Sequence, residues 1–208
     1  MPINVFGRHH LVVIALGYAA GIAAFPWLPG PYSVSAQLLT RAAIAFLIPT
    51  AALVTCWAVD RLSSRAETGT PHTASIQAAS VVVLCAALFM LTLHGFILVA
   101  LLGFPIRQFS PHRMIVVLTG LLLIGVGNVL PRIRPNIAIG ICTRRLLENR
   151  TAWTRVHRVV GYGLVGLGVL TVAAGSVLSQ YQVPSLLSTA VVIAVTVNVT
   201  AYWRWTRG

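Results

Sequence analysis

The side chains able to do acid–base, nucleophilic or metal chemistry are few and scattered in this chain. Its 208 residues include only three acidic ones and no lysine. Paired carboxylates for hydrolysis, acidic ligands for magnesium and a serine–lysine dyad are therefore not available. The cysteines have neither zinc-like spacing nor the pattern of a disulfide framework. We expect a non-enzymatic protein with no cofactor and no metal site. The acids and cysteines are Asp60, Glu67, Glu148, Cys56, Cys85 and Cys142.

Six histidines remain as candidates for chemistry. Only His94 lies well inside an apolar segment, where a histidine could relay protons or ligate haem. No second histidine shares its depth, so we favour a histidine that is hydrogen-bonded to a neighbouring helix. No carboxylate lies within the apolar segments, which weakens the interpretation as a proton-coupled transporter. The others are His9, His10, His72, His112 and His157.

The elements that must position these side chains are long and apolar. The chain is 57% hydrophobic and 9% charged, whereas a soluble domain is usually about 25% charged. Unpaired backbone groups are too costly in lipid for open strands, so we predict an all-α, polytopic membrane helix bundle forming one domain over residues 1–208. Six segments approach the roughly 20 residues that a spanning helix needs. They are Leu11–Leu28, Ala42–Val59, Ala78–Leu102, Met114–Leu130, Val159–Leu178 and Leu186–Trp203.

Arginine supplies all of the formal net charge of +12. The basic residues flank the apolar segments without interleaved aromatics, so we expect no nucleic-acid partner. Most arginines fall at the N-terminus, after the second and fourth segments, and at the C-terminus; the other side holds only Arg41, Arg107 and Arg113. Positively charged loops stay in the cytoplasm. Both termini and the loop 130–158 are therefore predicted to be cytoplasmic.

The stretch 128–161 joins the fourth and fifth segments and is too polar to span a bilayer. Pro131 and Pro135 predict that the fourth helix ends near Leu130 and that a stiff, extended segment follows through Asn136. Isoleucines then alternate with other residues, which favours a short strand or a chain lying on the membrane surface. These isoleucines are Ile133, Ile137, Ile139 and Ile141.

A helix is predicted to restart at Asn149, a good N-cap residue. On that helix Trp153 and His157 are four residues apart and share a face, and Gly161 follows on the same side. Gly140, which precedes this helix, permits a sharp turn or a close backbone contact. An anionic-lipid contact explains the arginines of the loop, but not these residue types at these spacings. We therefore predict a rigid loop folded back on the bundle.

Glycines recur every seven residues in the fifth segment, at Gly161, Gly168 and Gly175. They form one seam along a helix, and small residues let helix backbones approach closely in lipid. The seam could serve a dimer interface or packing within the same bundle, and we favour packing within the bundle.

At these residues the chain resembles the SdpI family of bacterial membrane proteins. The matches follow the family pattern without a gap: Gly127-Asn128, Leu130-Pro131, Ile133, Pro135-Asn136, Ile139-Gly140-Ile141, Thr143, Leu147, Trp153, His157-Arg158 and Gly161. Cys142 stands where the family usually has arginine. Arg144, Arg145 and Leu146 replace Pro-Trp-Thr, so the local fold there is expected to differ.

The resemblance extends more loosely back to about residue 78. It implies an SdpI-like four-helix region over residues 78–208, preceded by a degenerate two-helix module over residues 1–77. In that module the residues from Trp27 to Pro31 resemble the start of an outer segment of the family, but the histidine expected after them is missing.

The resemblance implies immunity to a secreted toxin and, in some relatives, signalling to a cytoplasmic regulator, in the bacterial cytoplasmic membrane. Membrane lipids and a membrane-protein partner are the other partners considered. The alternative functions are an accessory subunit of a larger membrane complex and, less favoured, a small-molecule transporter. The residues expected to carry the function are Asn128, Pro131, Pro135, Asn136, Gly140, Thr143, Trp153, His157 and Arg158.

Overall fold

The computed structural model of the chain describes residues 7–30, 34–66, 73–104, 111–135 and 139–177, with short pieces at 191–192, 195–196, 199–200 and 202–204. Within these residues the regular secondary structure is helical and no strand occurs. The predicted all-α class is confirmed.

Five long helices and three short ones make up the described fold. The five long helices are each long and apolar enough to cross a membrane. The predicted sixth span, Leu186–Trp203, lies mostly outside the described residues, and its described pieces are helical. The elements are α1 (Arg8–Ala24), η1 (Phe25–Trp27), α2 (Val34–Ala66), α3 (Thr73–Leu101), α4 (Pro111–Val129), η2 (Leu130–Arg132), α5 (Arg144–Glu148) and α6 (Arg150–Val177).

Several helices extend beyond the apolar segments that predict them. α2 begins before Ala42 and ends after Val59, and α6 begins at Arg150 rather than at Val159. The apolar run marks the part of a helix that crosses the hydrocarbon. Polar residues at either end can continue the same helix outside it, so hydropathy alone gives bounds that are too short.

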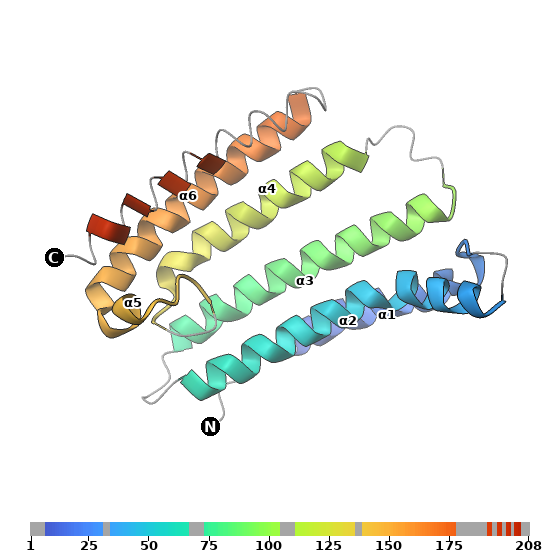
Figure 1. Cartoon of the computed structure of the whole chain (residues 1–208), viewed down its shortest axis with the longest axis horizontal. Helices are drawn as coiled ribbons and strands as arrows, with labels where there is room; N and C mark the ends of the chain where they lie inside the picture. The colour runs from blue at the N-terminus through green and yellow to red at the C-terminus, as the bar shows by residue number, and fades with distance from the viewer. Residues whose placement is uncertain are drawn as a thin grey trace.

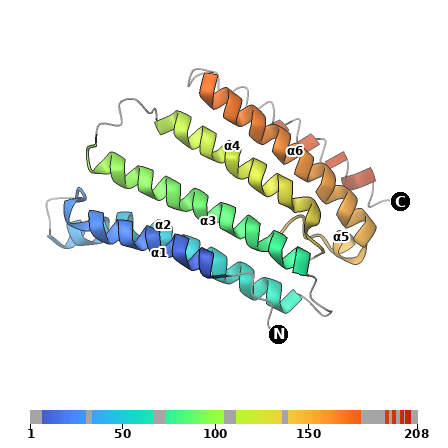
Figure 2. The same cartoon turned by 180° about the vertical axis from the view of Figure 1, so that it is seen from behind.

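The long helices lie side by side in a row. Figures 1 and 2 show α3, α4 and α6 in sequence, with α1 and α2 together on the other side of α3 and α5 at one end of α6. The contacts agree, because α3 packs on α1, α2 and α4, and α6 packs mainly on α4. Among the described residues the buried apolar side chains form four clusters: two between α1, α2 and α3, one where α3 meets the end of α4 and η2, and one between α5 and the start of α6.

α4 and α6 run antiparallel, and glycines on both helices let their backbones come into contact. A Cβ added at Gly168 would lie 2.6 Å from Gly120 O, and one at Gly161 would lie 2.7 Å from Gly127 O. Gly175 continues the seam, since its Cβ would lie 2.8 Å from Val116 Cγ1. α4 therefore occupies the glycine seam within the bundle, which is the alternative that we favoured for these glycines.

The start of α1, the end of α2 and the start of α3 meet the loop after α4 at one end of the bundle. Ile139 of the loop packs against the cluster that contains Val13 and Val83, beside Val59 and Ile76. His10 of α1 lies with its Nε2 3.0 Å from Ser80 O of α3. This end is called the loop end below. The described helices place arginines from α1, α2, η2, α5 and α6 there, including Arg8, Arg61, Arg132, Arg144 and Arg150.

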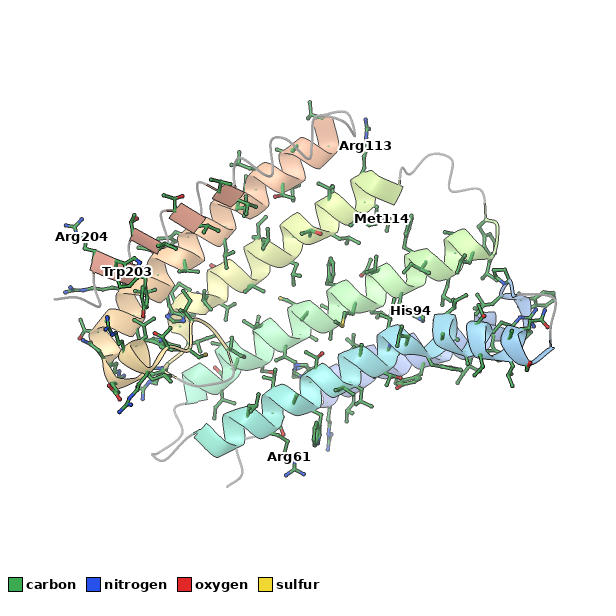
Figure 3. All side chains as sticks on the ribbon, viewed as in Figure 1. Arg61, His94, Arg113, Met114, Trp203 and Arg204 are labelled. Atoms are coloured by element: carbon green, nitrogen blue, oxygen red, sulfur yellow. The ribbon has the colours of Figure 1, made fainter. Side chains whose placement is uncertain are left out.

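His94 is enclosed between α1, α2 and α3. Its side chain has no exposed surface, and within the described residues neither ring nitrogen has a hydrogen-bond partner. Figure 3 labels it on the side of α3 that faces α1 and α2. It lines a small cavity with Gly17 and Pro49, of about 10 Å³, which is close to the space of one water molecule. The ring lies against the backbone of Gly17 on α1, so the predicted neighbour is present, but the contact does not meet hydrogen-bond geometry.

Candidate functional site

The loop that follows α4 first continues as a single helical turn. η2 carries Pro131 in its first turn, where the missing amide hydrogen costs nothing because that amide has no helical acceptor. Extended backbone begins at Ile133, with φ −78° and ψ 129°. The prediction that the fourth helix ends near Leu130 is confirmed, since α4 ends at Val129, but the extended segment begins at Ile133 and not at Pro131 as predicted. Asn136 lies outside the described residues.

Trp153 of α6 anchors the first part of this loop. Its indole Nε1 donates a hydrogen bond of 2.8 Å to Ile133 O, and the side chain has no exposed surface. Ile133 is itself buried against Val129 and Leu130. Because a buried indole N–H needs an acceptor and this carbonyl supplies it, the bond fixes where the chain leaves η2.

His157 anchors the second part of the loop, one helical turn later. Its Nδ1 lies 2.9 Å from Trp153 O. A carbonyl oxygen only accepts, so Nδ1 carries the ring hydrogen and Nε2 is left as an acceptor. Nε2 then accepts a 3.1 Å hydrogen bond from the backbone amide of Ile141. The ring is fully buried and stacks on Trp153, with centroids 3.8 Å apart. His157 is therefore held as one neutral tautomer.

Gly140 lets the backbone pass directly against the His157 ring. Its φ of +109° is a conformation that side chains disfavour, and an added Cβ would collide with His157 Nε2. Both features require glycine. Trp153, His157, Gly140 and the backbone groups of Ile133 and Ile141 form one unit, which is called the loop clamp below.

Three of the four loop isoleucines, Ile133, Ile139 and Ile141, pack into the bundle and not along its surface, and Ile137 lies outside the described residues. Ile133 is 2% exposed, Ile139 packs between α3 and the end of α4, and Ile141 packs against the cluster around Leu146 and Val156. The alternatives of a short strand or a surface-lying chain are therefore wrong for these residues. Their burial follows from the hydrogen bonds of Trp153 and His157 to the loop, because these bonds hold the isoleucine side of the loop against the bundle.

The segment after the clamp forms a second small helix. Thr143 is the N-cap residue of α5 and its carbonyl accepts from the amides of Leu146 and Leu147. The Thr143 hydroxyl accepts a 3.4 Å bond from the Tyr202 hydroxyl near the C-terminus. Asn149 caps α6, because its Oδ1 accepts from the amide of Ala152 at 3.0 Å. The predicted helix start at Asn149 is confirmed.

Three other residues expected at the site take no part in the clamp. Asn128 is exposed near the end of α4, Arg158 is exposed on α6, and Pro135 is half-buried. Pro131 lies against α6, since a Cβ at Gly161 would lie 2.8 Å from Pro131 Cγ. The clamp thus unites only part of the expected set.

Two kinds of group in the site escape sequence reasoning. The carbonyl of Ile133 and the amide of Ile141 are backbone atoms, so the residue types leave no signal for them. Tyr202 is distant in sequence from Thr143, and no spacing or motif in the sequence connects the two residues. The counterpart glycines Gly120 and Gly127 do carry a signal, because they repeat the seven-residue spacing of α6.

An open apolar hollow of about 430 Å³ adjoins the clamp. Val160 of α6, Ile141 and Thr143 line it from one side, and Val199 and Tyr202 line it from the C-terminal pieces. Figure 3 shows Trp203, which also lines it, at this end of the molecule. The hollow therefore borders Ile141, whose backbone amide donates a hydrogen bond to His157 Nε2.

The chemistry available at the clamp is neutral hydrogen bonding. Among the described residues no three histidine, cysteine or acidic side chains come together as a metal site would require. The ion pair of this region, Arg144–Glu148 at 2.8 Å, lies on the exposed surface of α5. The site can therefore hold or release the loop, and protonation of His157 would remove the acceptor that Ile141 uses.

Comparison with known proteins gives one match. Residues 132–202, about a third of the chain, match the SdpI/YfhL protein family. No curated protein and no solved structure matches the chain significantly. The matched region begins in η2 and contains the loop clamp, α5 and α6. Over residues 132–202 the chain is therefore similar to the SdpI/YfhL family.

Proposed function

We propose that this chain is a non-enzymatic protein of the bacterial cytoplasmic membrane that confers immunity to a secreted toxin or signals to a cytoplasmic regulator. The observation that carries the proposal is the loop clamp. Two fully buried rings hold two separate points of one loop, and that loop lies inside the region that matches the family. Buried hydrogen bonds hold this loop, and a buried polar group that loses its partner destabilises the fold.

The hollow beside the clamp supports a way in which a ligand could act. An apolar peptide segment in the hollow would touch Ile141, whose amide is bonded to His157. A shift of Ile141 would open that bond and leave a buried acceptor without its donor. The loop would then have two arrangements that a ligand can bias, which is the requirement for a signalling element.

The test compares Trp153→Phe with Trp57→Phe in the source bacterium lacking its own copy of the gene. Trp153→Phe keeps an aromatic ring but deletes the bond to Ile133 O, whereas Trp57 is 56% exposed on α2. Survival is measured in the organism's own stationary-phase culture medium, with fresh medium as the control. We expect the Trp57 variant to survive as wild type does and the Trp153 variant to lose at least tenfold.

Loop integrity is measured in parallel by limited proteolysis in membranes. We expect faster cleavage between residues 133 and 144 in Trp153→Phe at an unchanged expression level. Wild-type survival of a variant whose loop is cleaved faster would contradict a role of the clamp in immunity. A role in signalling would instead be seen as a changed transcript profile with unchanged survival.

The alternative of an accessory subunit loses one of its supports. A glycine seam left open to a partner would have supported that alternative, but α4 already fills the seam of α6. Purification in a gentle detergent checks the alternative, because a stoichiometric membrane partner would favour it.

A further inference from the structure

A basic hollow lies on the opposite face of the same turns of α6 that carry the clamp. Its volume is about 390 Å³, and its lining is Arg150, Thr151, Thr154, Arg155 and Arg158. Arg150, Thr154 and Arg158 follow one another every fourth residue, and Thr151 and Arg155 form the adjacent row. All three arginines are exposed.

The buried and exposed faces of these turns divide the residues cleanly. Ala152, Trp153, Val156 and His157 are buried against the loop and the bundle, and the arginines and Thr151 face outward. A helix that needed only solubility could use uncharged polar residues on that face. Here it carries three guanidinium groups within nine consecutive residues.

These charges have no acidic partner within the described residues. Glu148, the nearest acid in sequence, is bonded to Arg144 at 2.8 Å. The Thr154 hydroxyl is turned back on the helix, where it donates to Arg150 O at 3.0 Å. The donors that face outward are therefore the three guanidinium groups and the Thr151 hydroxyl. The positive end of the α6 dipole adds to their field.

The position along the helix fixes what anion can reach the hollow. α6 runs from these turns directly into an apolar stretch that ends at Val177 and is long enough to span a membrane. Arginines at the end of such a span lie at the level of the lipid headgroups. Guanidinium groups bind phosphate oxygens with paired hydrogen bonds. The three arginine side chains therefore suit the phosphodiester of a lipid headgroup.

We propose that Arg150, Arg155 and Arg158, with Thr151, form a binding site for the phosphate group of an anionic phospholipid. The site is independent of the proposed function, since it uses side chains that take no part in the clamp. It would fix the depth and rotation of the first turns of α6, and with them the face that holds the loop.

The test uses the purified full chain in a neutral detergent, titrated with phosphatidylglycerol or phosphatidylcholine and observed by native mass spectrometry. The triple variant R150Q/R155Q/R158Q is compared with R61Q/R113Q/R204Q, which removes the same charge from exposed arginines elsewhere. Each arginine near a lipid surface contributes roughly fivefold in affinity. We expect the first variant to weaken phosphatidylglycerol binding about 100-fold and the second to weaken it much less, with phosphatidylcholine binding weak throughout.

Two further measurements keep the result interpretable. Helical circular dichroism and thermal unfolding of R150Q/R155Q/R158Q should match wild type, because the changed side chains are exposed; a variant that fails this check is replaced by the three single variants. Inorganic phosphate and ATP are added as soluble competitors and should not displace the lipid at equal concentration. Equal loss in both triple variants, or displacement by the soluble phosphates, would overturn the proposal.

Discussion

At the scale of single residues, the loop clamp requires one particular tautomer of the His157 ring. His157 can donate to Trp153 O and accept from Ile141 only with its hydrogen on Nδ1. The sequence spacing predicts that Trp153 and His157 share a helix face, and the structure confirms it. The backbone partners of the two rings could not be predicted, because a carbonyl or an amide is present at every position and only the path of the loop selects one.

Gly140→Ala tests whether the close approach to His157 matters beyond backbone strain. Gly103 is the matched control, since it also has a positive φ, +74°, but has open space around its Cα. Each alanine should cost about 1–2 kcal/mol for its left-handed backbone. At Gly140 the Cβ also meets the His157 ring and breaks the Ile141 bond, which adds about 1 kcal/mol or more. The measurement is the free energy of unfolding in detergent micelles. Equal losses for the two variants would show that the ring contact is not stabilising.

At the scale of elements, the five long helices that the structure describes were predictable from the sequence, but their neighbours were not. The length of each apolar run reveals a spanning helix, and Asn149 marks the start of α6. Which helix packs on which could not be inferred, because in lipid the face against hydrocarbon and the face against protein are equally apolar. Glycine is the exception. The seven-residue repeat in α6 predicts a packing seam, and only the structure shows that Gly120 and Gly127 of α4 complete it.

Gly168→Ala should separate α4 from α6. Its Cβ would lie 2.6 Å from Gly120 O and 2.9 Å from the backbone nitrogen of Ile124, so the two backbones must move apart. We expect a loss of about 1–3 kcal/mol, as in other overpacked contacts. Gly166→Ala, two residues away, meets nothing within 4 Å and should be neutral or stabilise α6 by up to about 1 kcal/mol through helix propensity. Unfolding in a denaturing detergent distinguishes them. A Gly168 variant as stable as the Gly166 variant would show that the seam tolerates a wider spacing.

At the scale of the whole molecule, the arginines gather where the chain folds back on itself. The loop end unites the start of α1, the end of α2, the start of α3 and the clamp. The charge pattern predicted that these segments share one side of a membrane. The structure places them at one end of the bundle, and which compartment that end faces stays a prediction from the positive-inside pattern.

Cys142 offers a direct measurement of that orientation. It is the exposed one among the three cysteines, whereas Cys56 is buried and Cys85 is half-buried where α3 meets Gly125 of α4. If the loop end is cytoplasmic, a membrane-impermeant maleimide should label opened spheroplasts and leave intact ones unlabelled. Cys142 donates to Gly140 O at 3.3 Å, and partial desolvation of its sulfur raises the pKa of the thiol. Labelling is therefore run at about pH 8.5, where more of the reactive thiolate is present. Cys142→Ser should abolish the signal. Equally strong labelling of intact and opened spheroplasts would place the loop end on the outer side, and with it both termini, which are predicted to share its side.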